Sequence, residues 1–73
     1  MDRVVLEQLL QEAEIRLHRE ELTIANQREA IGTLERRGHD TANAKTLLRR
    51  LESRQARHIA ERNRLFMELT DYA

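Results

Sequence analysis

Histidine carries the broadest chemistry in this 73-residue chain, because imidazole binds metal ions and ordinarily titrates near neutral pH. Of the three histidines, His58 could meet Glu20 or Glu21 across two facing helices and share a metal ion with that carboxylate. Helical metal sites of this kind repeat a Glu-x-x-His spacing that the sequence lacks, and His18 and His39 fall elsewhere. We therefore expect no metal site and a hydrogen-bonded histidine between helices. Association that depends on pH through His58 is an alternative.

A second group of residues that could carry a function is a series of basic residues in the second half of the chain. They recur on one stripe of a helix, and they are Arg50, Arg54, Arg57 and Arg64, with Lys45 and Arg49 alongside. Such a stripe could follow the phosphates of a nucleic acid. Against this, Glu61 and Glu68 interrupt it, and the formal net charge of the chain is zero. A solvated, salt-bridged face is the more ordinary interpretation, so nucleic-acid binding is a secondary hypothesis.

The composition argues against an enzyme. The chain has no Cys, no Pro, no Trp, one Phe and one Tyr, and 36% of its residues are charged, which is typical of long exposed helices. It contains no glycine-rich phosphate loop and no zinc motif. So short a chain also offers no cleft large enough to keep water from a reaction. We expect no catalytic residue, no cofactor and no small-molecule substrate.

The expected location is the cytoplasm. No apolar run approaches the roughly 20 residues that a membrane span needs, so we expect no membrane association. The first residues lack a basic segment followed by a long apolar stretch, so no secretory signal is expected. The absence of cysteine fits a reducing compartment.

Two interleaved seven-residue series predict a coiled-coil-like helix over about residues 3–36, capped by Asp2. One series is Leu10, Leu17, Ile24 and Ile31, and the other is Leu6, Ala13, Glu20, Gln27 and Leu34. Glu20 and Gln27 interrupt the second series, and they should lie at the edge of the seam or form a polar layer that fixes register. Gly32 costs about 1 kcal/mol relative to alanine. It would permit either close backbone approach or fraying near the turn.

A similar pattern predicts a second helix over about residues 41–70. Its two series are Ala44, Leu51, His58, Leu65 and Tyr72, and Leu48, Gln55, Arg62 and Leu69. The apolar stripe is strong at both ends and weak in the middle, as it is in the first helix.

The turn between the helices is expected at residues 37–40. Gly38 can adopt the left-handed conformation that ends a helix, and Asp40 or Thr41 can accept hydrogen bonds from the amides that open the next one; His39 lies between them. The first half of the chain is biased towards acidic residues and the second half towards basic ones, which favours folding back. The predicted fold is therefore all-α, a single antiparallel two-helix hairpin spanning residues 1–73.

This turn sets a register in which the numbers of facing residues add to about 75–78. The expected apolar neighbours are Leu10 with Leu65, Ile24 with Leu51, Leu6 with Leu69, and Ile31 with Ala44. The expected polar layer comprises Glu20, Gln27, Gln55 and His58. In this register Glu20 and Gln55 fall together, and His58 lies close to Leu17 and Glu21. On the flank we expect Glu14 to face Arg64 and Glu21 to face Arg57, while Arg28 would meet Arg50 unfavourably.

One hairpin has more apolar residues than a single seam can cover. Val5, Leu9, Leu47, Ile59 and Phe66 should stay partly exposed, and pairing two hairpins into a four-helix bundle would cover them, which predicts a homodimer. The complete set of expected interface residues is Leu6, Leu9, Leu10, Leu17, Ile24, Ile31, Leu47, Leu48, Leu51, His58, Ile59, Leu65, Phe66 and Leu69. The predicted function is a non-enzymatic interaction or regulatory adaptor that self-associates and binds a partner helix. The alternative within this class is a structural module with no partner beyond itself.

The segment Leu34-Glu35-Arg36-Arg37-Gly38-His39-Asp40-Thr41, with His58-Ile59-Ala60 and Arg62-Asn63-Arg64-Leu65 further on, resembles a pattern in short uncharacterised alphaproteobacterial proteins. Those proteins share a Gly-His-Asp-Thr turn and a helix that ends in His-x-x-(Asp/Glu)-Arg-(Asp/Asn)-Arg-Leu. The resemblance covers the second half of the chain by its motifs and the first half by its amphipathic character. It implies a bacterial helical hairpin, without an established activity.

Overall fold

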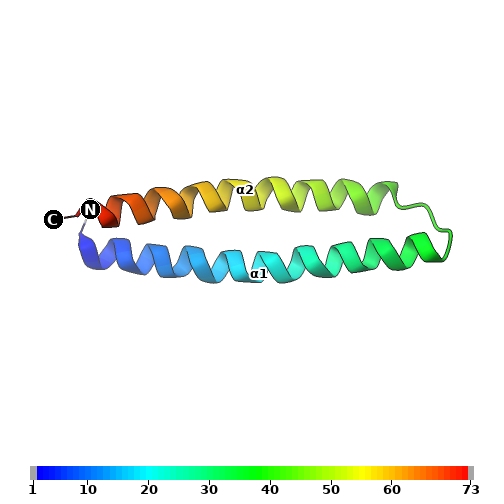
Figure 1. Ribbon diagram of the computed structural model, residues 1–73, viewed down its shortest axis with the longest axis horizontal. Coiled ribbons are helices and arrows are strands. Elements are labelled where there is room, and N and C mark those ends of the chain that lie inside the picture. The colour runs from blue at the N-terminus through cyan, green and yellow to red at the C-terminus, as the bar shows by residue number, and fades with distance from the viewer. Residues whose placement is uncertain (1, 73) are drawn as a thin grey trace.

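Two long helices make up the hairpin in this computed structural model, which describes residues 2–72. Helix α1 spans Arg3–Arg36 and helix α2 spans Ala42–Thr70. They lie side by side and antiparallel, with the turn at one end and both chain ends at the other (Figure 1). The molecule is a rod of 57 × 15 × 13 Å, and residues 2–72 contain no strand. The expected all-α class and the packing of two helices are therefore confirmed.

Helix α1 begins as its sequence predicts and continues without a break to its last residue. The carboxylate of Asp2 accepts a hydrogen bond from the backbone N–H of Val4 at 3.4 Å. Gly32 does not interrupt the helix, and a Cβ added there would meet the Arg36 guanidinium of the same helix at 3.4 Å. No α2 atom lies within 4 Å of that Cβ, and the helix continues to Arg36, so neither of the two alternatives for Gly32, close backbone approach or fraying, is observed.

The turn begins with a hydrogen-bonded helix stop centred on Gly38. Gly38 has a φ of +72°, a left-handed conformation that costs little without a side chain. Its N–H donates to the carbonyl of Glu35 at 3.0 Å, and the N–H of His39 donates to the carbonyl of Leu34 at 2.9 Å. This pair of bonds is the Schellman arrangement, and it satisfies carbonyls that the end of α1 would otherwise leave free.

Helix α2 begins one residue later than the sequence predicted, so the turn spans residues 37–41. Of the two candidate caps, Asp40 is the one that acts. Its Oδ1 accepts a hydrogen bond from the N–H of Ala42 at 2.9 Å, whereas the Thr41 side chain makes no such bond. The capping oxygen therefore belongs to Asp40, the residue before the N-cap residue Thr41, and the first helical residue is Ala42.

The core is a narrow seam to which the two helices contribute unequally. Of residues 2–72, six are buried, and they are Leu6, Ala13, Leu17, Ile24 and Ile31 of α1 and Leu65 of α2. Leu6, Ala13 and Leu65 form a cluster at the open end of the hairpin, with Leu9, Leu10 and Leu69 packed against it. This cluster agrees with the predicted register. Along the rest of α2 the expected seam residues Ala44, Leu48 and Leu51 are only half-buried.

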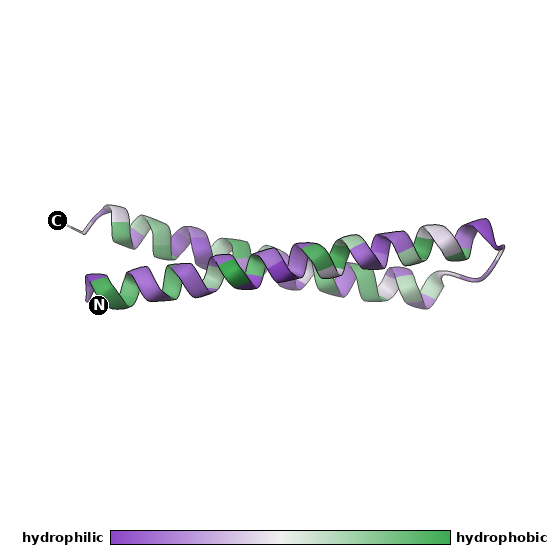
Figure 2. Ribbon diagram, turned by 90° about the horizontal axis from the view of Figure 1, so that it is seen from below, coloured by the Kyte–Doolittle hydropathy of each residue, from purple (hydrophilic) through white to green (hydrophobic). Residues whose placement is uncertain are grey.

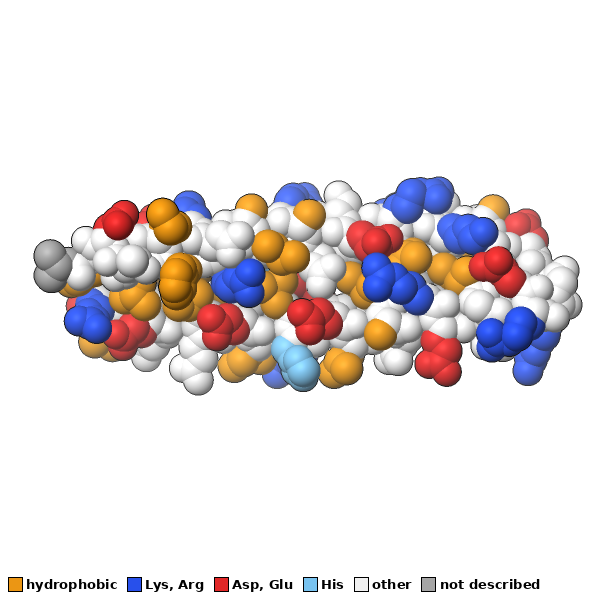
Figure 3. Space-filling view, viewed as in Figure 1, with side chains coloured by type: hydrophobic (Ala, Val, Ile, Leu, Met, Phe, Trp, Pro, Cys, Tyr) orange, Lys and Arg blue, Asp and Glu red, His pale blue; other side chains and the backbone are white. Residues whose placement is uncertain are grey.

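Much apolar surface remains outside this seam. Figure 2 shows hydrophobic and hydrophilic residues alternating along the whole of both helices, and in Figure 3 hydrophobic side chains reach the surface among acidic and basic ones. The exposed large apolar residues are Val4, Val5, Ile15, Leu22, Leu47, Ile59, Phe66, Met67 and Tyr72. Of the five residues expected to be left over, four are among these and Leu9 is half-buried. Over residues 2–72, neither helix has an apolar stretch long enough to cross a membrane.

Candidate functional site

The polar contact at the centre of the hairpin joins His58 of α2 to Glu20 of α1. Nδ1 of His58 lies 2.6 Å from Oε2 of Glu20, and the two side chains retain 25% and 17% of their surface exposed. The two atoms share one hydrogen bond, and the tautomer of the imidazole determines which of them donates. Glu20 occupies a position in one of the two seven-residue series that face α2, which is why its carboxylate points towards α2 rather than solvent.

The second carboxylate oxygen of Glu20 is unusual. Oε1 is buried, and it has no hydrogen-bond partner among the described residues. A buried polar atom without a partner costs about 1–3 kcal/mol in folding free energy. The centre of the hairpin therefore holds one well-made polar contact and one atom whose hydrogen bonding the protein leaves incomplete.

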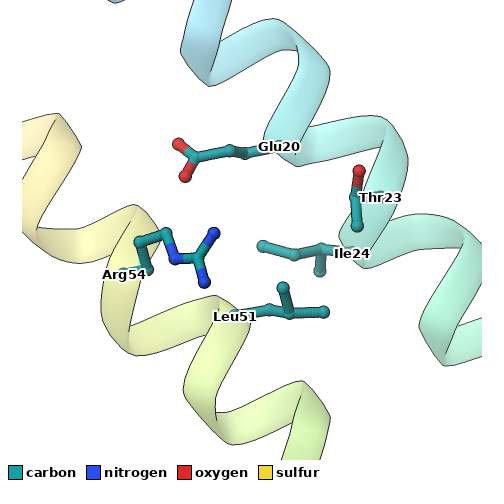
Figure 4. Close-up of a pocket in the computed structure, with 5 residues that line it drawn as sticks. All are labelled: Glu20, Thr23, Ile24, Leu51 and Arg54. Atoms are coloured by element: carbon teal, nitrogen blue, oxygen red, sulfur yellow. The ribbon is translucent and has the colours of Figure 1, made fainter.

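A small cavity of about 80 Å³ lies beside this carboxylate, lined by Glu20, Thr23, Ile24, Leu51 and Arg54. Figure 4 shows the Arg54 side chain reaching from α2 into the space below Glu20, with Ile24 and Leu51 facing each other beside it. No ion pair joins Arg54 to Glu20 within residues 2–72. Since a water molecule takes up about 30 Å³ in the liquid, the cavity has room for about two. It is far smaller than the roughly 300 Å³ at which pockets for small molecules begin.

The remaining members of the expected polar layer lie apart from this pair. Nε2 of Gln27 donates to the backbone carbonyl of Ala44 at 3.0 Å, and this contact is half-buried. Helix carbonyls point towards the C-terminus, so the Gln27 amide lies between the levels of Ala44 and Leu48. Gln55 is half-buried, with no side-chain hydrogen bond to the described residues. Three of the four residues thus form two separate polar contacts along the seam, and Gln55 takes part in neither.

The charged flank differs from the sequence prediction. Nη2 of Arg28 lies 3.1 Å from Oε2 of Glu52, so Arg28 has an acidic neighbour where Arg50 was expected. Glu52 follows the seam residue Leu51, and Arg50 precedes it. The second seam series of α2, through Leu48 and Gln55, lies on the side of the helix to which Glu52 projects. Glu52 therefore borders the seam, and Arg50 points outward.

The other two expected flank pairs are wrong for the same reason. Arg64 is bound by Glu68 of its own helix at 2.7 Å, and Glu14 lies beside Arg62, Asn63 and Phe66. No ion pair between Glu21 and Arg57 occurs among the described residues. Arg57 and Arg64 each precede a seam residue, as Arg50 does, and therefore lie outside the reach of α1.

The histidines do not assemble into a metal site. His18 and His39 are exposed, and His39 lies in the turn, remote from the centre. Within residues 2–72, no three side chains of His, Cys, Asp or Glu come together as metal ligands. The expected pairing of Glu20 with Gln55 is wrong, because His58 takes that place beside Glu20. The sequence carried no signal for the unsatisfied Oε1 or for Arg54 beside it.

In comparisons with known proteins, the chain matches no family model, no curated protein and no solved structure. The resemblance to the alphaproteobacterial group therefore stays a prediction that rests on the turn and on the motif of the second helix.

Proposed function

We propose that this chain is a small helical interaction module that associates with itself and binds a helix of a partner protein. The observation that supports this is the imbalance of apolar surface, because among residues 2–72 six residues are buried and nine large apolar residues are exposed. Large apolar patches on small soluble proteins mark interaction surfaces. Two hairpins packed as a four-helix bundle would cover part of this surface.

Ile15 and Leu22 support the second half of the proposal. They are 46% and 56% exposed and lie seven residues apart on α1, beside neither seam series. The hairpin itself does not use them, and helix-in-groove recognition relies on apolar residues at such spacings. In the alternative, a self-assembling module without other partners, these two residues would have no role.

The first experiment is the molar mass by light scattering at tens of micromolar. A dimer is expected, and a monomer would contradict self-association. The second is capture of partners from the native cell by wild-type protein and by a Leu22→Glu variant, with Arg36→Glu as a matched surface control. A partner lost only with Leu22→Glu supports the adaptor; a dimer that captures nothing favours the self-assembling module.

The proposal assigns the chain neither catalysis nor a cofactor, and it places the protein in the cytoplasm. The absence of cysteine supports that location. The turn motif of residues 38–41 supports a bacterial hairpin of the alphaproteobacterial group.

Nucleic-acid binding is a second candidate, favoured by the exposure of Arg50, Arg54 and Arg57 and by the lack of an ion pair at any of them within residues 2–72. Phosphate contacts would make such binding fall steeply with salt. A mobility shift with duplex DNA at low salt tests it, and no binding there would remove it.

A further inference from the structure

One side of the hairpin carries both Thr23 of α1 and Arg54 of α2, which line the central cavity together. We call it the Thr23–Arg54 face. Residues seven apart share a helix side, so the face includes further positions of each helix. They are Leu9, Arg16 and Ala30 on α1, with Glu12 and Arg19 at its margin, and Leu47, Glu61 and Glu68 on α2, with Arg50, Arg57 and Arg64 at its margin.

We propose that the Thr23–Arg54 face binds a second copy of this chain, related by a two-fold axis parallel to the rod. The product is a four-helix bundle in which α1 of one subunit lies antiparallel to α2 of its partner. This inference rests on the self-association proposed above and adds the face, the symmetry and the register of the pairing.

The symmetry determines which residues meet. Rotation about an axis parallel to the helices leaves every residue at its own level along the rod. Helix α1 therefore faces the partner's α2 in the register that it already has with its own α2. Within the hairpin, residues at one level have numbers that add to 75–80, as Ile24 with Leu51 and Arg28 with Glu52 show.

In this register the charges of the face are complementary at two levels. Arg16 lies opposite Glu61 of the partner subunit, and Glu12 lies opposite Arg64 of the partner subunit. All four side chains are exposed in the hairpin, and Arg16, Glu61 and Glu12 make no ion pair within residues 2–72. The two-fold axis produces each contact twice, so the face presents four opposite-charge contacts.

The apolar contacts and the size of the Thr23–Arg54 face also favour this pairing. Ala30 lies opposite Leu47 of the partner subunit, and Leu47 is 46% exposed in the hairpin, so pairing would cover it. One side of a rod 57 Å long and 15 Å wide also matches the roughly 800 Å² per partner that a stable interface buries.

Pairing through the opposite side of the hairpin by the same two-fold rotation would be less favourable. That side carries Glu14, Glu21, Ile59 and Phe66, and Glu14 already lies beside Phe66. The same register would place Glu14 near Phe66 of the partner subunit and Glu21 near Ile59 of the partner subunit. Burying a carboxylate against apolar side chains without a hydrogen bond is unfavourable. On the Thr23–Arg54 face, Glu68 lies opposite Leu9 of the partner subunit, but Glu68 is hydrogen-bonded to Arg64.

One level of the Thr23–Arg54 face is repulsive, and it provides a sensitive check. Arg19 lies opposite Arg57 of the partner subunit, and both are exposed. Arg57→Glu would replace this repulsion by attraction. Whereas reversing the charge of Arg16 or Glu61 should weaken the dimer, Arg57→Glu should tighten it.

The experiment is a charge swap measured by analytical ultracentrifugation of the full chain. Arg16→Glu alone and Glu61→Arg alone should each weaken the dimer by about tenfold, because two contacts change from attraction to repulsion. An equimolar mixture should restore wild-type affinity, since each variant supplies the charge that the other needs. Glu21→Arg, on the opposite side, is the control and should leave the dimer constant unchanged.

The results separate this inference from the proposed function. A wild-type dimer whose single variants bind normally, or whose mixture does not recover, overturns the assigned face while self-association stands. A monomeric wild type overturns both. A monomer that binds duplex DNA through Arg16 and Arg57 would assign the face to phosphates and likewise overturn the inference. Circular dichroism verifies folding of each variant, and Glu12→Arg with Arg64→Glu repeats the swap if Arg16→Glu does not fold.

Discussion

The open end of the hairpin and its centre contain the same pair of seven-residue series but differ in chemistry. At the open end, Leu6, Ala13 and Leu65 are buried against one another. At the centre, the seam holds Glu20 and His58, with a cavity and an unsatisfied oxygen beside them. Apolar packing stabilises any register that keeps the surfaces together, whereas the polar pair tolerates few alternatives.

A slip of α2 by seven residues shows the consequence. His58 would move away from Glu20, and either Leu51 or Leu65 would take its place. The carboxylate would then lie half-buried against leucine without a partner, which is strongly unfavourable. The open end therefore supplies stability, and the centre selects the register. Substitutions in the two regions should separate these roles.

Leu65→Ala should have the largest effect, because Leu65 is the buried residue that α2 contributes to the open-end cluster. Its truncation leaves a cavity that the rigid seam cannot fill, and we expect a loss of about 2–4 kcal/mol in unfolding free energy. Urea denaturation followed by circular dichroism measures the change. Leu47→Ala, at an exposed position of the same helix, is the control in dilute protein. Equal losses in the two variants would contradict the role assigned to the open end.

His58→Leu should cost about 1–3 kcal/mol, because it leaves the half-buried carboxylate of Glu20 without its hydrogen bond. The double variant Glu20→Leu/His58→Leu makes the seam apolar and should recover this loss or exceed wild-type stability. Its register should become less specific, which distance measurements between spin labels on the two helices would detect. A double variant with one sharp distance would show that the pair does not select the register.

The two glycines should respond in opposite directions, by about 1 kcal/mol each. Gly38→Ala should destabilise the hairpin, since Gly38 has a φ of +72° that a Cβ disfavours. Gly32→Ala should stabilise it, because Gly32 is helical and the nearest neighbour of an added Cβ is the flexible Arg36 side chain at 3.4 Å. Thermal unfolding of both variants measures the effect. Neither glycine belongs to the open end or the centre, so the register should be unchanged in both.

Arg28→Ala should have the smallest effect, below about 0.5 kcal/mol. Arg28 and Glu52 cross between the helices at 3.1 Å, but their side chains are 60% and 44% exposed, and such pairs contribute little. The loss should shrink further in high salt. An effect as large as that of His58→Leu would show that the exposed flank, and not the half-buried pair, selects the register.

The amino-acid sequence was sufficient to predict the features of this protein that depend on residues close together in the chain. The series through Leu6 and Leu10 predicted α1 with its observed bounds, and Gly38 predicted the place of the turn. These features follow from local backbone conformation and from a period that every turn of the helix repeats. The same period put Glu20 and His58 near the middle of the hairpin once the turn was located, but it paired Glu20 with Gln55, whereas the structure pairs it with His58.

Which side chains meet around the seam depended instead on the packing of the two helices. The level of a residue along the rod follows from its number. The direction in which its side chain points depends on how far each helix is rotated about its own axis when the two seams pack together. That rotation brought Glu52 rather than Arg50 to Arg28. It also left Oε1 of Glu20 beside a cavity with Arg54. Such features depend on the shapes of several side chains packed together, which spacing along one chain does not specify.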